Sequence, residues 1–235
     1  PAAMQQIIET IGQNDVVFLG EQHDDSVAHA LQFEIFKTAI EKYSAVRKVS
    51  LSLEMFERDT QVVVNEYLMD LITEKKLNVI AANAPRRYVN MVSRNGRVSL
   101  NSLSKEAKSF LPPLPYAEPT KAYSDKFKAL MGPSPEAQMG IDKILASQSL
   151  WDAGMAYSIS QNIVAKGLIV HLNGAFHTEN RLGTVEHLLR YKPKTKVLVV
   201  TMRYEENFTN FDKAKHSNLG DFVILTDAKQ PRRKR

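Results

Sequence analysis

The sequence contains no cysteine, which excludes disulfide bonds, thiolate metal sites and cysteine nucleophiles. It also lacks any run of 18 apolar residues, so we expect no membrane-spanning helix. The formal net charge is +5, and removing the four charges of the last four residues leaves +1. No basic stripe interleaved with aromatic residues is present, and nucleic acid is therefore not an expected partner. Phosphate-binding glycine loops, Gly-x-Ser-x-Gly elbows and His-Glu-x-x-His helices are absent as well.

The composition is that of an ordinary globular protein, with 43% hydrophobic and 24% charged residues in a chain of 235. This length suits one α/β domain, which we predict at residues 1–228, followed by a basic, disordered tail at 229–235. No signal peptide begins the chain, and we expect a processed or trimmed form whose targeting segment is absent.

Strand-like and helix-like patterns alternate along the chain. This order predicts a mainly parallel sheet with helices on both faces and a helical excursion between strands. Strands are expected at 16–20, 49–53, 78–82, 168–172, 196–202 and 222–226. Helices are expected at 25–43, 59–74, 120–130, 136–165 and 177–191, with Gly167 stopping the fourth and a proline-rich irregular stretch at 110–135.

One junction is unusual. The helix predicted at 59–74 meets the next strand at Lys76-Leu77 with no glycine or proline between them. A connection of this type normally needs a loop. We therefore predict that Lys76 and Leu77 are not ordinary neighbours and that residues are missing there.

Polar and ionisable residues follow four of the predicted strands. Glu21 and His23 follow the first, Glu54 the second, Asn83 the third and His177 the one at 168–172; four of these residues are ionisable. The carboxyl edge of a parallel sheet is where ligands bind, so we expect these four side chains to share a pocket. Two imidazoles and two carboxylates suit general acid–base catalysis, or a divalent metal held by Glu21, His23 and His177. A structural alternative stays open, in which the histidines cap helices and Glu54 pairs with an arginine.

Five ordered segments resemble the ChaN family of haem-binding proteins, within the Tiki, TraB and erythromycin-esterase-like group. They are Gly20–Asp25, Leu53–Asp59, Ala82–Tyr88, Ser147–Asp152 and Asn173–His177, and the similarity covers about residues 14–205. The resemblance implies a parallel α/β core, haem binding, iron ligation by a tyrosine and two stacked haems in a homodimer. It also implies a plastid location if the source is a photosynthetic eukaryote, and metal-dependent peptidase or esterase activity in distant relatives. The family's usual helical stretch with tryptophan is absent at the Lys76-Leu77 junction.

Haem needs an apolar slot, cations for its propionates and an axial ligand. Arg86 and Arg87 are the candidate cations, and we expect Arg87 to face the site. The candidate iron ligands are Tyr88, Tyr116 and Tyr123. The residues assigned to ligand binding are Asn83, Arg86, Arg87, Tyr88, Trp151 and Asn173. Met55, Met91 and Met155 are possible lining residues, although helical spacing favours a core position for Trp151 and Met155.

Two hypotheses about function follow. The first is a haem- or tetrapyrrole-binding protein that handles tetrapyrrole or iron. The second is a hydrolase in which Glu21, His23, Glu54 and His177, with or without a divalent metal, attack an ester, amide or tetrapyrrole-related substrate.

Overall fold

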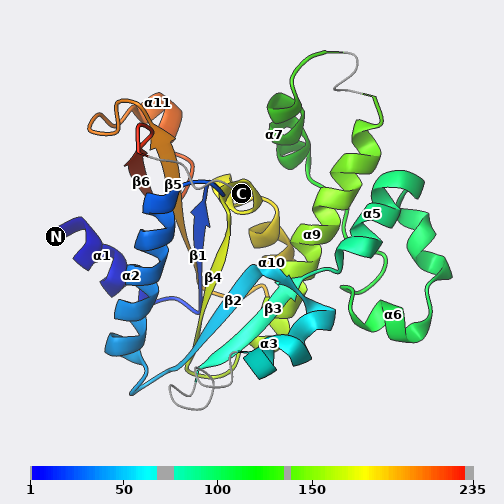
Figure 1. The fold of residues 1–235 in the computed structure, drawn as a ribbon, viewed down its shortest axis with the longest axis horizontal. Coiled ribbons are helices and arrows are strands. Elements are labelled where there is room, and N and C mark those ends of the chain that lie inside the picture. The colour runs from blue at the N-terminus through cyan, green and yellow to red at the C-terminus, as the bar shows by residue number, and fades with distance from the viewer. Residues whose placement is uncertain (1, 68–76, 135–138, 231–235) are drawn as a thin grey trace.

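The computed structural model describes residues 2–67, 77–134 and 139–230. A single sheet of six parallel strands forms its centre, in the order β3-β2-β4-β1-β5-β6 (Figure 1). The strands are β1 (Val16–Glu21), β2 (Lys48–Glu57), β3 (Asn78–Asn83), β4 (Gly167–Gly174), β5 (Val197–Glu205) and β6 (Phe222–Asp227). The predicted α/β architecture is confirmed.

Helices cover both faces of this sheet because successive strand residues point to opposite sides. Val17 and Leu19 pack with α1 (Ala2–Ile11) and α2 (Ser26–Tyr43) on one face. Phe18 packs on the other face with α9 (Ile141–Asn162) and α10 (Thr184–Tyr191). The central strands β1 and β5 are accordingly apolar on both sides, as expected for a parallel sheet between two helical layers.

The remaining helical segments lie at the strand ends and in the excursion between β3 and β4. They are η1 (Arg58–Thr60), α3 (Gln61–Tyr67), α5 (Arg86–Asn95), η2 (Arg97–Ser102), α6 (Lys105–Ser109), α7 (Lys121–Met131), η3 (Ala175–His177), η4 (Glu179–Arg181) and α11 (Lys213–His216). No helix within the described part of the chain is long and apolar enough to cross a membrane.

Local chemistry fixes several of these boundaries. Asp25 caps α2 by accepting hydrogen bonds from two backbone amides of its first turn. Gly154 lets α9 approach the end of β3, since a Cβ at this position would lie 2.8 Å from the Cβ of Ala84. The long helix is thereby held against the edge of the sheet where the polar residues gather.

Three boundaries differ from the sequence prediction. The helix expected at 136–165 ends at Asn162, and Gly167 is instead the first residue of β4, while Lys166 adopts the positive φ. The helix expected at 177–191 begins at Thr184, because Gly183 has a φ of 57° and two 3-10 turns precede it. Helix α1 was missed. The Lys76-Leu77 junction, the later part of the helix expected at 59–74 and most of the C-terminal tail lie outside the described residues.

Candidate functional site

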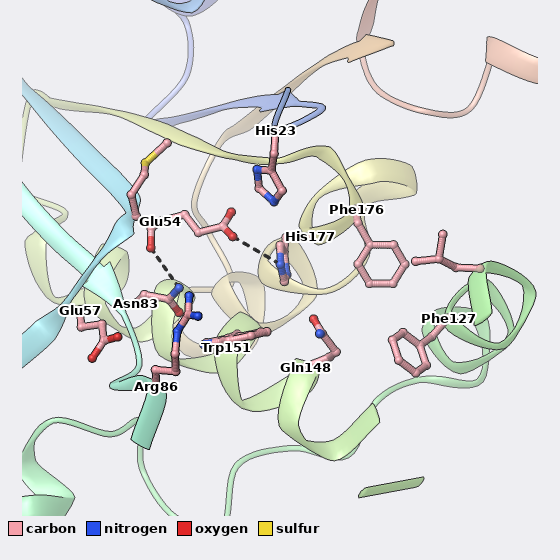
Figure 2. Close-up of a pocket in the computed structure, with 12 residues that line it drawn as sticks. His23, Glu54, Glu57, Asn83, Arg86, Phe127, Gln148, Trp151, Phe176 and His177 are labelled. Carbon is pink, nitrogen blue, oxygen red and sulfur yellow. Dashed lines mark hydrogen bonds and ion pairs between the residues drawn. The ribbon is translucent and has the colours of Figure 1, made fainter. Parts of the chain in front are cut away.

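The carboxyl ends of β1, β2, β3 and β4 converge on a pocket of about 580 Å³ (Figure 2). Its lining residues are His23, Glu54, Met55, Glu57, Asn83, Arg86, Phe127, Leu130, Gln148, Trp151, Phe176 and His177. A second hollow of about 520 Å³ shares His23, Phe176 and His177 with it and adds Glu21. The four residues predicted to gather at the sheet edge therefore lie around two adjoining cavities.

Glu21 lies beneath His23 and orients it. The Glu21 carboxylate is almost fully buried, and its Oε1 lies 2.8 Å from His23 Nδ1. Its Oε2 lies 3.4 Å from Nε2 of His29 on α2. The His23 side chain is 51% exposed and extends to both cavities. A buried carboxylate on Nδ1 fixes the ring orientation of the histidine.

His177 is the most strongly perturbed group in the site. Its Nδ1 lies 2.8 Å from Asp152 Oδ1, and its Nε2 lies 3.6 Å from Glu54 Oε1. Burial lowers the pKa of the His177 imidazole, but the carboxylates of Asp152 and Glu54 outweigh this effect and raise the pKa to about 9. At neutral pH His177 is therefore a buried cation with both ring nitrogens protonated.

Asp152 is a site residue that the sequence analysis did not single out. It is fully buried on α9 and accepts hydrogen bonds from His177, from Thr184 Oγ1 at 2.7 Å and from the Tyr123 hydroxyl. Burial raises the pKa of the Asp152 carboxyl, but the charge of His177 and these hydrogen bonds bring it below its ordinary value. The available signal was a carboxylate on the predicted long helix, next to Trp151 and within the segment Ser147–Asp152 that carries the family resemblance.

Glu54 and Asn83 are held by backbone contacts. Glu54 Oε2 accepts a hydrogen bond from the Gly174 amide at 2.7 Å, and Asn83 Nδ2 donates to the Glu54 carbonyl at 3.0 Å (Figure 2). A side chain at Gly174 would displace the His23 ring, because a Cβ there would lie 2.8 Å from His23 Cε1. These contacts tie the ends of β2, β3 and β4 into one frame.

The expected orientation of the two arginines is wrong. Arg86 lines the pocket, whereas Arg87 forms an ion pair with Asp59 and packs 4.5 Å over the Tyr88 ring. Consecutive helical residues point about 100° apart, so α5 presents only one of the pair to the site. Asp59 lies on η1 outside the pocket and draws Arg87 away; a local sequence pattern does not reveal this long-range partner.

The tyrosines are not where an iron ligand was expected. Tyr116 is buried with its hydroxyl donating to the Ala146 carbonyl at 2.8 Å, and Tyr123 is buried with its hydroxyl on Asp152. Burial raises the pKa of Tyr116 to about 12 and that of Tyr123 well above its ordinary value. Tyr88 packs beside a separate apolar cluster and does not line the pocket. The structure thus brings none of the three to this cavity.

Apolar side chains from three elements form the wall of the pocket. Trp151 on α9, Phe176 on η3 and Phe127 on α7 face it, and Trp151 packs edge-on against His177 at 6.5 Å (Figure 2). Sequence analysis missed Phe127, Leu130, Gln148 and Phe176 as lining residues, although the amphipathic pattern of α7 was present.

Three further candidates lie away from the pocket. Met155 is fully buried in the sheet core, and Met91 packs beside another cluster. Asn173 is fully buried, and its Nδ2 donates to Gly174 and Thr178. This asparagine braces the turn between β4 and η3, so its observed contacts are structural.

The predicted metal site is not supported. Among the residues that the structure describes, no group of three or more His, Asp and Glu side chains is arranged to hold a metal ion.

The arrangement combines a cavity with one aromatic wall, an arginine and a histidine flanked by carboxylates. It is suited to enclosing a flat apolar ligand with an acidic edge, or to moving protons at a bond held beside His177.

Comparison with known proteins found one matching family model and several similar solved structures. A family model described as haem-binding uptake, Tiki superfamily, ChaN matches residues 7–79 and 68–188, and the two matches overlap at 68–79. The ChaN protein of Campylobacter jejuni, solved with cofacially bound haem, has a TM-score of 0.70 at 18% identity, over 93% of this chain and 90% of that chain. At that identity the likeness shows the fold alone.

Two other solved structures are more distant. They are the erythromycin esterase EreC in an open conformation, with a TM-score of 0.46, 9% identity and coverage of 86% and 73%, and a Bacillus cereus protein, with a TM-score of 0.40, 14% identity and coverage of 86% and 69%. Scores this low carry no argument. No curated protein matches the chain.

Proposed function

This chain belongs to the ChaN family of haem-binding uptake proteins in the Tiki superfamily, and on that premise we propose that it binds haem or a related tetrapyrrole. The observation that carries the proposal is the pocket of about 580 Å³ at the sheet edge, which combines aromatic walls with a cation. A tetrapyrrole has the matching chemistry, with flat apolar faces and acidic propionates.

The residues present fit this ligand. Trp151, Phe127 and Phe176 would contact the ring faces, and Arg86 would hold a propionate through charge-assisted hydrogen bonds. His23 would hold the iron, because imidazole is a common haem ligand and this histidine lines the pocket. His177, as a cation, would instead donate a hydrogen bond to the ligand.

A titration with haemin tests the proposal. We expect a Soret band that saturates at a ratio of 1:1 or 2:2, and His23→Ala to change its position or intensity. Sedimentation of the loaded protein reports whether the expected homodimer forms. A spectrum identical to that of free haemin at micromolar protein would contradict haem binding.

The two arginines provide a matched pair of variants. A hydrogen bond to a charged group contributes about 1.5–3 kcal/mol, so Arg86→Gln should weaken haemin binding about tenfold to a hundredfold. Arg87→Gln, on the same helix but bound to Asp59, should leave the affinity within about threefold because exposed ion pairs contribute little. Equal losses in the two variants would contradict the assignment of Arg86.

A hydrolase is the second candidate function, and the His177 environment favours it. His177 is protonated, buried and 3.6 Å from the Glu54 carboxylate, so the two groups form an acid and a base side by side. Glu54 or His23 would take a proton from water as its oxygen bonds to an ester or amide carbonyl. His177 would give a proton to the leaving group as its bond to the carbonyl carbon breaks.

An ester and peptide panel tests this activity. We expect hydrolysis by the wild type and a loss of kcat of about a hundredfold or more in His177→Gln and Glu54→Gln. Measuring the metal content of the same preparation separates metal-assisted from metal-free hydrolysis. Activity that survives both substitutions would refute this role.

A further inference from the structure

Three consecutive charged residues at the end of β2 point in three directions. Glu57 lines the haem-sized pocket, Asp59 pairs with Arg87, and Arg58 lines a different cavity. Among the described residues, Arg58 has no carboxylate within ion-pair distance, although acidic neighbours flank it in the sequence. The Arg58 guanidinium is therefore directed away from Glu57 and Asp59, its two acidic neighbours in the sequence.

The cavity beside Arg58 lies over the edge strand β3, between α3 and the last turns of α9. Both helices contact this strand (Figure 1). The cavity measures about 310 Å³ and shares no lining residue with the two cavities at the carboxyl edge. Its described lining residues are Arg58, Gln61, Asn65, Asn78, Val79, Ile80, Ala81, Ser158, Gln161 and Asn162. Five carboxamides, one hydroxyl and one cation are thus gathered without any described carboxylate.

Part of this polar lining has a structural purpose. The Gln61 side chain donates to the Val79 carbonyl at 2.9 Å and accepts from the Ala81 amide at 2.7 Å, which pairs the exposed edge of β3. Ser158 donates to the Ala82 carbonyl. The exposed carboxamide of Gln161 makes no hydrogen bond within the described residues and remains available to a ligand.

Arg58 is the chemically unusual member of the group. Its guanidinium lies 5.1 Å over the Tyr157 ring, and its buried Nη1 has no hydrogen-bond partner in the described part of the chain. Burial lowers the pKa of this guanidinium, and Tyr157 offsets the effect only in part. Partly burying a cation without an anionic partner costs free energy, and a bound anion would offset this cost.

We propose that this cavity binds a small polyhydroxylated oxyanion, a sugar phosphate or a sugar carboxylate. The oxyanion would pair with Arg58, whose planar fork matches phosphate and carboxylate oxygens. The hydroxyls would bond to the carboxamides, which both donate and accept. A volume of about 310 Å³ is at the lower end of small-molecule sites and suits a single sugar unit.

Calorimetry with four probes tests the proposal on protein free of haemin: glucose 6-phosphate, gluconate, glucose and inorganic phosphate. We expect saturable binding of glucose 6-phosphate or gluconate, at least tenfold tighter than that of glucose or inorganic phosphate. The first two probes distinguish phosphate from carboxylate as the anionic group. Arg58→Gln should weaken this binding about tenfold to a hundredfold, while Arg87→Gln should leave it unchanged.

A second variant keeps the test decisive if Arg58→Gln does not fold. Gln161→Ala removes an exposed side chain without internal hydrogen bonds, so the fold should persist while the preference for the hydroxylated anion over inorganic phosphate falls. The proposal is overturned if no probe binds saturably, if inorganic phosphate binds as tightly as the sugar anions, or if the folded variants bind like the wild type. None of these results depends on haem binding.

Discussion

Replacing Asp152 by asparagine should reveal how strongly the site holds its buried cation. The asparagine oxygen can still accept hydrogen bonds from His177 and Thr184, so the shape of the network is preserved while its negative charge is lost. The perturbation therefore acts mainly on the protonation of His177.

The expected loss of folding free energy follows from the pKa of His177. Its pKa is about 9 in the folded protein against an ordinary value of 6.5, a difference that corresponds to about 3 kcal/mol of folding free energy. Because the folded value is the higher one, this stabilisation is fully present below pH 6.5 and is lost as pH rises through about 9. Glu54 remains near the ring in the variant and keeps part of this stabilisation. We therefore expect Asp152→Asn to lower the free energy of unfolding by about 2–3 kcal/mol at pH 6.

Urea unfolding at pH values from 6 to 10 measures this effect, and NMR titration of the His177 ring nitrogens reports the pKa directly. As the pH rises from 6 to 10, the free energy of unfolding of the wild type should fall towards that of Asp152→Asn. The two values should be equal near pH 10. Asp142→Asn, an exposed position on the same helix, is the control and should run parallel to wild type. A constant difference between wild type and Asp152→Asn across the range would refute the reasoning.

Three further predictions concern close packing and buried hydrogen bonds. Gly174→Ala should leave the protein folded but weaken haemin binding in a spectroscopic titration, since the new Cβ would lie 2.8 Å from His23 Cε1 and displace this ring. Gly154→Ala should lower the unfolding free energy by about 1–3 kcal/mol in urea, because its Cβ would meet Ala84 at 2.8 Å; an unchanged midpoint would contradict the tight helix–strand contact. Tyr123→Phe should lower the unfolding free energy by about 1–3 kcal/mol, because it removes a hydrogen bond to a buried carboxylate. A variant as stable as the wild type in urea would show that this bond is dispensable.

Much of the frame follows from the sequence alone. Apolar β-branched runs separated by amphipathic segments specify a parallel sheet between helical layers, because only that arrangement buries strands that are apolar on both faces. The same order places Glu21, His23, Glu54 and His177 at one edge, since parallel strands share their direction. These conclusions depend on the periodicity within each segment and on the order of the segments along the chain, and both can be read directly from the sequence.

Tertiary structure decided which atoms meet within that frame. Arg87 was drawn to Asp59, 28 residues earlier, and Arg86 was left to face the pocket. Asp152 became the partner of His177 only when α9 packed against the turn after β4. Side-chain partners in a folded core depend on packing between distant segments and on the burial that strengthens each charge, and neither is encoded in local residue spacing.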